Sequence, residues 1–234
     1  MKTIGLLGGM SWESTSDYYR LINQDVKQRL GDLHSAQIAM FSVDFHVIEK
    51  LQQQGDWQGA AMLLCEAAQN IEKAGADFLL ICTNTMHKVA PEIEAAINIP
   101  LLHIADATAE VLSKDGIKSV GLLGTAFTME QDFYRGRLEN MHGLTVLLPS
   151  QADRQLVHDV IYQELCLGQV KADSKFEYLR VIDDLKQQGA EAVILGCTEI
   201  GMLVKQSDTP IRLLDTTSIH AKAAVDLAIP MISD

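Results

Sequence analysis

The amino-acid sequence predicts an α/β protein made of two similar half-domains, each with its own parallel sheet. Two observations lead to this prediction. Short apolar runs of strand length alternate with amphipathic helical patterns along the chain, which is typical of parallel sheets covered by helices on both faces. In addition, segments of the first half recur in the second half at a nearly constant distance.

The internal repeat pairs two chemically interesting positions. Residues 74–85 align without a gap with residues 188–199, which places Thr83 opposite Cys197, 114 positions later. Residues 2–8 (KTIGLLG) resemble residues 118–124 (KSVGLLG) at a shift of 116. We therefore expect a pseudo-twofold molecule whose central cleft presents equivalent residues from opposite sides, as a reaction on two faces of one carbon would require.

The elements follow the same order in both halves. In the first half, strands are predicted at 3–7, 37–43 and 78–81, and helices at 14–30, at 57–73 and after His87. In the second half, strands are predicted at 120–123, 145–148 and 192–195, and helices at 157–167 and 176–186. Gly31, Gly75, Gly168 and Gly189 each follow a periodic run, as expected at helix ends. The first domain is predicted to span 1–99 with a C-terminal helix from 217–234, and the second 100–216.

Composition limits the class of protein. A chain of 234 residues with 47% hydrophobic residues can bury a core in each of two halves. The net charge of -12 argues against binding of nucleic acid, which needs clustered Lys and Arg. No apolar run is long enough for a membrane span or a signal peptide, so a cytoplasmic location is expected. The four cysteines form neither a disulfide framework nor a zinc signature.

Polar residues follow the predicted strands, where ligands bind in parallel α/β folds. Cys197 comes after the strand at 192–195 and before a helix expected to begin near Thr198. A thiol at a helix N-terminus is exposed to unpaired backbone donors and to the positive end of the dipole, which lower its pKa from about 8.5. Cys197 is therefore a candidate base. A lone cysteine is more often a small buried residue, but the repeat and the polar neighbours favour the site.

Thr83 occupies the equivalent position in the first half. Successive strand residues point to opposite faces, so we expect Thr83 to face the cleft and Cys82 to lie in the core. Capping of the following helix is the alternative role of Thr83. Asn84, Thr85 and Thr198 add short donors suited to the carboxylate of an amino acid, although capping explains each of them individually.

No cofactor or metal is expected. Gly8 and Gly9 form a strand-to-helix turn, but the dinucleotide-binding glycine fingerprint and phosphate-binding loops do not occur. The seven histidines have no ligand spacing, and structural or solvated roles explain them better.

Three motifs resemble the aspartate/glutamate racemase superfamily, the racemases that work without pyridoxal phosphate. They are GLLGGMSWEST at 5–15, TNTMH at 83–87 and GCTE at 196–199. The resemblance covers nearly the whole length, and with MEQDFY at 129–134 and ELCLG at 164–168 it looks closest to the YgeA-type enterobacterial racemases.

This resemblance implies interconversion of L- and D-amino acids by two opposed groups, one removing the α proton and the other returning one. Cys197 matches the second family cysteine, whereas Thr83 replaces the first. The substrate-binding residues implied by the resemblance and the strand-end positions are Met10, Gln52, Asn84, Thr85, Thr125, Thr198 and Glu199. The loop expected at 46–55 offers Lys50 and Gln52 but no definite carboxylate clamp. Family members are commonly homodimers.

Two other functions remain open. Loss of the first cysteine is compatible with a non-catalytic protein that binds or senses amino acids. A relative acting on hydantoin or malonate-type substrates would also pass through an enolate-like intermediate.

Overall fold

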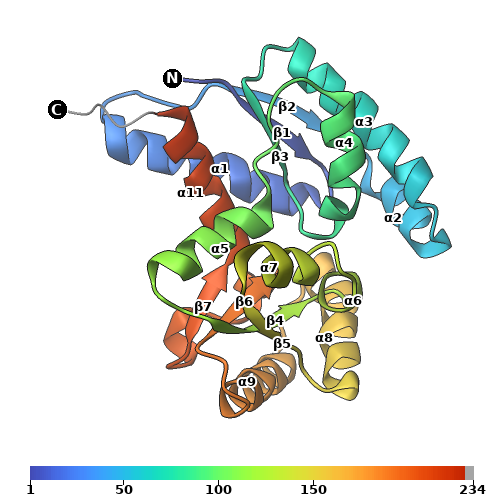
Figure 1. Cartoon of the computed structure of the whole chain (residues 1–234), viewed down its shortest axis with the longest axis vertical. Helices are drawn as coiled ribbons and strands as arrows, with labels where there is room; N and C mark the ends of the chain where they lie inside the picture. Colours follow the sequence, from blue (N-terminus) through green and yellow to red (C-terminus); the bar gives the residue numbers. More distant parts are fainter. Residues whose placement is uncertain (230–234) are drawn as a thin grey trace. The chain divides into compact units, whose positions relative to one another are not determined.

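The computed structural model describes residues 1–229, which form two compact units. The first unit comprises Met1–Ile104 together with the segment from His220 onward, and the second comprises Ala105–Ile219 (Figure 1). The chain therefore crosses between the units twice, after Ile104 and before His220. The predicted domain ranges of 1–99 with 217–234 and 100–216 stay a prediction.

The first unit contains a parallel sheet in the strand order β2-β1-β3. The strands are β1 (Ile4–Gly8), β2 (Ile38–Ser42) and β3 (Phe78–Ile81). Both β1 and β3 are buried along their full length, whereas residues 40–42 at the end of β2 are exposed. Leu101 adds an isolated parallel bridge to Leu79 on the other side of β3.

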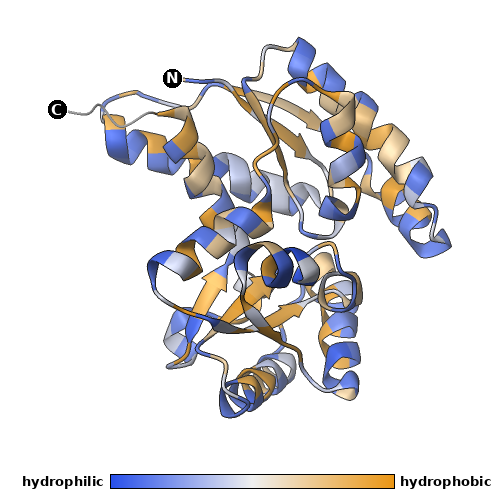
Figure 2. Ribbon diagram, in the orientation of Figure 1, coloured by the Kyte–Doolittle hydropathy of each residue, from blue (hydrophilic) through white to orange (hydrophobic). Residues whose placement is uncertain are grey.

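Helices bury both faces of this sheet. Helix α3 (Trp57–Lys73) and helix α4 (Ala90–Ala96) contribute to a core cluster with Leu7, Leu79 and Ile81. Helix α1 (Trp12–Leu30) and the part of helix α11 (Thr216–Ala228) from Ala221 onward share the second cluster, with the alternate strand residues Leu6 and Leu80. The strands accordingly appear hydrophobic in Figure 2, while the helices alternate between hydrophobic and hydrophilic residues.

The segment 46–55, predicted as a loop, is a helix. Helix α2 spans Phe45–Gln54, and the carboxylate of Asp44 accepts a hydrogen bond from the backbone N–H of His46 at 3.0 Å. Gly55 ends the helix in the left-handed conformation with φ 70°. Both local signals are present in the sequence, and Ile48 and Gln52 bury one face at helical spacing.

The second unit repeats this arrangement with one additional strand. Its parallel sheet has the order β5-β4-β6-β7. The strands are β4 (Ser119–Gly124), β5 (Thr145–Leu147), β6 (Ala192–Gly196) and β7 (Arg212–Asp215). The predicted α/β class with two parallel sheets is therefore confirmed, although β7 was absent from the prediction.

The helices of the second unit are α5 (Ile104–Lys114), α6 (Ala126–Glu130), α7 (Arg135–His142), α8 (Gln151–Gln163), α9 (Ala172–Gln187) and α10 (Ile200–Leu203). The two helices predicted at 157–167 and 176–186 begin earlier than expected, whereas the helix expected to begin near Thr198 begins at Ile200. Helix α8 starts at Gln151 because the Ser150 hydroxyl caps it by accepting a hydrogen bond from Asp153 N. The helix predicted at 157–167 ends at Gln163, and a 3-10 turn at Leu165–Leu167 leads to Gly168. Short 3-10 turns also occupy Thr85–Val89 and Gln206–Asp208.

Within residues 1–229, no helix combines the length and the apolar character that crossing a membrane requires.

The turn after β1 depends on a glycine. Gly9 has φ 93°, and a Cβ at this position would lie 2.2 Å from the Val43 carbonyl oxygen. We predict that Gly9→Ala lowers the free energy of unfolding by about 3 kcal/mol or more, because left-handed strain and a backbone clash add together. Denaturant unfolding measures the change. Gly55→Ala is the matched control: its φ is also positive, but nothing lies within 4 Å, so a loss of only about 1 kcal/mol is expected. Equal losses in the two variants would contradict the clash.

Candidate functional site

The first group of predicted site residues lies where β1 and β3 end. Ile81 pairs with Leu7, and the backbone N–H of Cys82 donates to the Leu7 carbonyl at 2.9 Å. Continuing this register places Thr83 beside Gly9. Thr83 is partly exposed, whereas Cys82 is fully buried among the residues of the α1 and α11 face, as predicted. Burial raises the pKa of the Cys82 thiol.

The segment that follows Thr83 is buried and leads directly into the 3-10 turn at Thr85–Val89. Asn84 and Thr85 are 3% and 7% exposed. The Asn84 carbonyl accepts a hydrogen bond from His87 N at 3.1 Å, which begins the 3-10 turn. The chain therefore keeps both polar side chains close to the end of β3.

Met10 and Gln52 also belong to the first unit. Met10 is 3% exposed and packs in the core cluster on the α3 face. The Gln52 side chain is 5% exposed, and its Nε2 donates to the Met86 sulfur at 2.8 Å. Gln52 reaches this buried position because it projects from the inner face of α2, not from a loop.

The second group lies where β4 and β6 end. Gly124 pairs with Gly196, so the next residues, Thr125 and Cys197, follow side by side. The Thr125 hydroxyl caps α6 by accepting a hydrogen bond from Thr128 N at 3.3 Å. Thr125 thus combines a strand-end position with a local structural role.

Sequence reasoning missed Thr217, which follows the neighbouring strand β7. Leu195 pairs with Asp215, the last residue of β7, and Thr217 lies in the first turn of α11 just beyond that strand end. The preceding Thr216 hydroxyl donates to the Leu195 carbonyl at 2.9 Å, and the Thr217 backbone N–H is capped by Asp215 at 3.0 Å. Within residues 1–229, the buried Thr217 Oγ1 has no hydrogen-bond partner. The signal in the sequence was the Asp-x-Thr pattern that both halves share, Asp106 with Thr108 and Asp215 with Thr217.

Cys197 forms a hydrogen-bonded pair with Glu199. The Sγ–H group donates to Glu199 Oε2 at 2.9 Å, and the Thr198 hydroxyl donates to the same oxygen at 2.6 Å. Glu199 is only 7% exposed. Desolvation, followed by the charge of Glu199, raises the pKa of Cys197 well above its usual value.

The prediction that a helix N-terminus lowers the pKa of Cys197 is therefore wrong. Helix α10 has only four residues and begins at Ile200, so the unpaired donors and the dipole that favour a thiolate are weak at Cys197. Cys197 is held as a thiol by the neighbouring carboxylate instead. The geometry makes the thiol a hydrogen-bond donor to Glu199 in the resting protein.

Four side chains form a buried polar cluster in the first unit, at Tyr18, His87, His103 and His220. The Tyr18 hydroxyl lies 2.8 Å from His220 Nδ1, and His220 Nε2 lies 2.8 Å from the Leu102 carbonyl. The His87 and His103 rings pack edge to face with centroids 4.4 Å apart. Desolvation lowers the pKa of His87 far below its usual value and that of His220 to about 4. Both histidines are therefore neutral at neutral pH.

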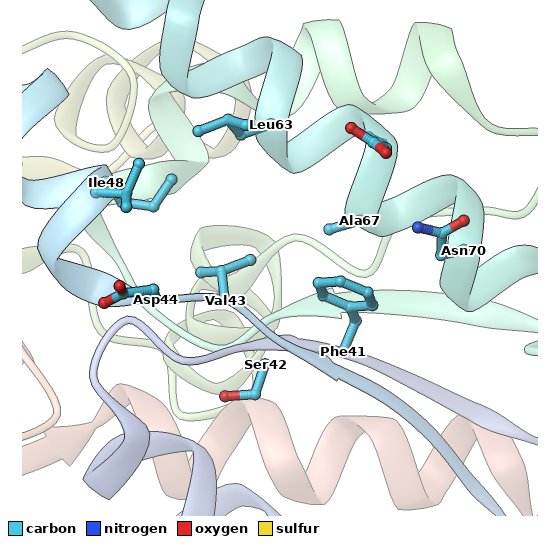
Figure 3. A pocket seen from close by; sticks show the side chains of 10 residues that line it. Phe41, Ser42, Val43, Asp44, Ile48, Leu63, Ala67 and Asn70 are labelled. Atoms are coloured by element: carbon cyan, nitrogen blue, oxygen red, sulfur yellow. The ribbon is translucent and has the colours of Figure 1, made fainter.

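Two other features do not involve the predicted site residues. A groove of about 300 Å³ lies in the first unit between the end of β2 and helices α2 and α3; Figure 3 shows Phe41, Val43 and Leu63 around it. None of the predicted site residues lines this groove. Among residues 1–229, no three His, Cys, Asp or Glu side chains are arranged to hold a metal ion.

The predicted site residues thus fall into two groups, one in each unit. Met10, Gln52, Thr83, Asn84 and Thr85 belong to the first unit. Thr125, Cys197, Thr198 and Glu199 belong to the second unit.

The buried histidines make stability depend on pH. Unfolded histidine binds a proton near pH 6.5, whereas folded His220 does so only near pH 4. Between these values the unfolded chain holds more protons, so stability falls as the pH is lowered. We predict that His220 alone removes up to about 3 kcal/mol from the free energy of unfolding.

Denaturant unfolding between pH 7 and pH 5 tests this prediction. His220→Gln keeps a donor for the Leu102 carbonyl but does not titrate, so it should flatten the pH dependence relative to the parent. An identical slope in the parent and in His220→Gln would contradict the assignment.

Comparison with known proteins identifies the family of this chain. The model of the Asp/Glu/Hydantoin racemase family matches residues 7–224. A broad specificity amino-acid racemase of Bacillus subtilis is 23% identical over 95% of this chain and 96% of its own length. A crystal structure of a proposed Asp/Glu racemase from Yersinia pestis is 57% identical, with a TM-score of 0.93 over 97% of this chain and 99% of that chain. An aspartate racemase homologue from Pyrococcus horikoshii is 33% identical, with a TM-score of 0.84 over the same shares of the two chains. The chain therefore belongs to the Asp/Glu/hydantoin racemase family and is an isomerase of the racemase type.

Proposed function

We propose that the protein is a cofactor-independent amino-acid racemase of the YgeA type, acting on aspartate, glutamate or a broader set of polar amino acids. Cys197 and Thr83 are the two proton-transfer groups, one acting on each face of the α carbon. One observation carries this proposal. Thr83 and Cys197 occupy the same topological position in two sheets of matching strand order.

The pairing supports chemistry on two faces of one carbon. β3 is flanked by β1 as β6 is flanked by β4, and the candidate group follows the strand in each case. Groups at equivalent strand-end positions, one from each unit, are suited to serve the two faces of one substrate carbon. Removal of a proton on one face and its return on the other inverts the centre.

The contacts of Cys197 suggest the first proton transfer. Glu199 accepts the thiol hydrogen bond, so transfer of this proton to Glu199 produces the thiolate. The thiolate then removes the α proton of an L-amino acid, and the resulting carbanion takes a proton from the Thr83 hydroxyl on the other face. A threonine hydroxyl is a much weaker acid than a thiol, so the return of a proton and the reverse direction are expected to be slow.

The remaining polar residues fit recognition of a small amino acid. Asn84, Thr85 and Thr198 supply short donors near strand ends, which suit the α-carboxylate and the negative charge that grows on it as the α proton leaves. Met10, Gln52 and Thr125 complete the proposed binding set. A cytoplasmic homodimer without metal or cofactor stays part of this proposal.

A second candidate is a protein that binds amino acids without turning them over. Two observations favour it: Thr83 replaces the family thiol, and burial with the charge of Glu199 raises the pKa of Cys197. The two functions differ in whether the α proton ever exchanges with solvent. A relative acting on hydantoins would exchange protons only on that class of substrate.

Assays in deuterated water with single enantiomers of aspartate and glutamate, in the presence of a metal chelator, separate these functions. We predict inversion and α-proton exchange in the parent. Cys197→Ser should lower both by at least about 10³-fold, while substrate still binds.

Thr83→Ala should retain Cys197-dependent exchange of the L-substrate with little inversion, and Thr83→Cys should speed the D-to-L direction. Binding without exchange in the parent would support the second candidate, and full inversion in Thr83→Ala would remove Thr83 from the mechanism.

Glu199 should be needed to accept the thiol proton. We predict that Glu199→Gln lowers kcat by about 10²- to 10⁴-fold, the range of general base catalysis, with a smaller effect on substrate affinity. Glu177→Gln is the matched control, because Glu177 pairs with Arg180 on α9. Steady-state kinetics and calorimetric binding measure the two effects. A variant Glu199→Gln with parental kcat and weakened binding would make Glu199 a binding residue only.

A further inference from the structure

The His87 side chain is held at both ends by backbone groups. Nδ1 lies 2.8 Å from the carbonyl oxygen of Thr83, and the backbone N–H of Ile104 donates to Nε2 at 3.3 Å. We propose that His87 is a positioning residue that fixes the backbone of Thr83 for its proton transfer. This inference rests on the proposed racemase function of Thr83.

The two contacts determine which nitrogen carries the proton. A backbone N–H can only donate, so Nε2 must present its lone pair to Ile104. Nδ1 must then carry the hydrogen and donate it to the Thr83 carbonyl, which can only accept. The neutral imidazole satisfies both backbone groups at once, and neither the other tautomer nor the imidazolium form does.

Neighbouring rings keep the His87 ring in place. His87 is 1% exposed, and the His103 and His220 rings lie with their centroids 4.4 and 6.0 Å away. His220 is itself fixed, because the Leu102 carbonyl at Nε2 leaves Nδ1 to accept from the Tyr18 hydroxyl. Burial and the neighbouring imidazoles lower the pKa of His87, which keeps it in the required neutral form.

Thr83 needs such a support because the sheet no longer holds it. The last assigned pair of β3 is Ile81 with Leu7, and the Cys82 N–H makes the adjacent bond to the Leu7 carbonyl. Within the sheet, a neighbouring strand provides the hydrogen bonds to the backbone of β3. Just beyond the sheet, the His87 side chain provides the hydrogen bond to the Thr83 carbonyl. The same ring contacts Ile104, the last residue before the chain enters the second unit. A proton donor must be positioned within a fraction of an ångström, so loss of this bond should affect Thr83 chemistry first.

A purely structural role makes a different prediction. If His87 only stabilised the turn at Thr85–Val89, its loss would lower stability and would reduce both proton transfers together. A positioning role instead changes the ratio of inversion to exchange. This ratio is independent of the amount of folded protein.

Two amide substitutions separate the two contacts of the ring. The amide nitrogen of His87→Asn lies near the position of Nδ1, so it can still donate to the Thr83 carbonyl. The longer His87→Gln places its amide oxygen near the position of Nε2, where it can accept from Ile104, but it loses the bond to Thr83. Each variant therefore keeps one contact and removes the other.

The test starts from L-aspartate or L-glutamate in deuterated water and measures D-enantiomer formation and deuterium in the recovered L-form. We expect His87→Gln to lower D-formation by 10- to 100-fold relative to exchange, and His87→Asn to keep the parental ratio within about threefold. An unchanged ratio in His87→Gln, or an equal fall in both variants, would overturn the positioning role. Failure of the parent to racemise or exchange would reject the proposed function instead.

Nitrogen NMR of the folded parent tests the underlying geometry even if a variant does not fold. At neutral pH, His87 should show a protonated Nδ1 and an unprotonated Nε2. A protonated Nε2, in either the other tautomer or the imidazolium, would overturn the inference without reference to activity.

Discussion

The burial of parallel strands on both faces determines where this molecule can place reactive groups. Every residue of β1, β3 and β6 is buried, and a polar side chain within such a strand would lose its hydration without a reliable partner. Polar residues are tolerated one or two positions later, where the backbone ladder ends and the chain turns. Thr83 and Cys197 lie at these positions in the two units. Chemistry at the strand ends therefore follows from the packing of the sheets.

The residues that follow β3 and β6 lie at equivalent positions in the two units but differ in chemistry. In the repeat, Glu199 of the second unit corresponds to Thr85 of the first, and His87 corresponds to Gly201. The second unit thus has a carboxylate next to its thiol, whereas the first unit has an imidazole that holds the backbone of its hydroxyl residue. This difference fits the two proposed roles. A thiol needs a proton acceptor to become a base, and a hydroxyl that mainly donates needs a fixed position.

The sequence predicts the features that depend on neighbouring residues better than those that depend on distant ones. Alternation along β3 correctly separates buried Cys82 from partly exposed Thr83. Helix α2 was missed although local signals indicate it: Asp44 and Gly55 mark its ends, and Ile48 and Leu51 recur at helical spacing. The pKa of Cys197 could not be predicted, since it depends on the length of α10 and on the direction of the Glu199 side chain. The contact of Tyr18 with His220 joins residues 202 positions apart, and no local pattern indicates it.

A raised thiol pKa is compatible with the proposed removal of an α proton. It lowers the fraction of thiolate at neutral pH, but the thiolate that does form is a stronger base toward a carbon acid. Glu199 offsets the low fraction of thiolate, because its carboxylate accepts the hydrogen bond along which the thiol proton would leave. An amino-acid substrate would also bring its ammonium group to the second group of site residues, whose nearest charged side chain is acidic, which offsets the repulsion between Glu199 and a thiolate. On this argument the substrate itself completes the electrostatic environment that allows Cys197 to act as a base, and the resting thiol is the form expected before the substrate arrives.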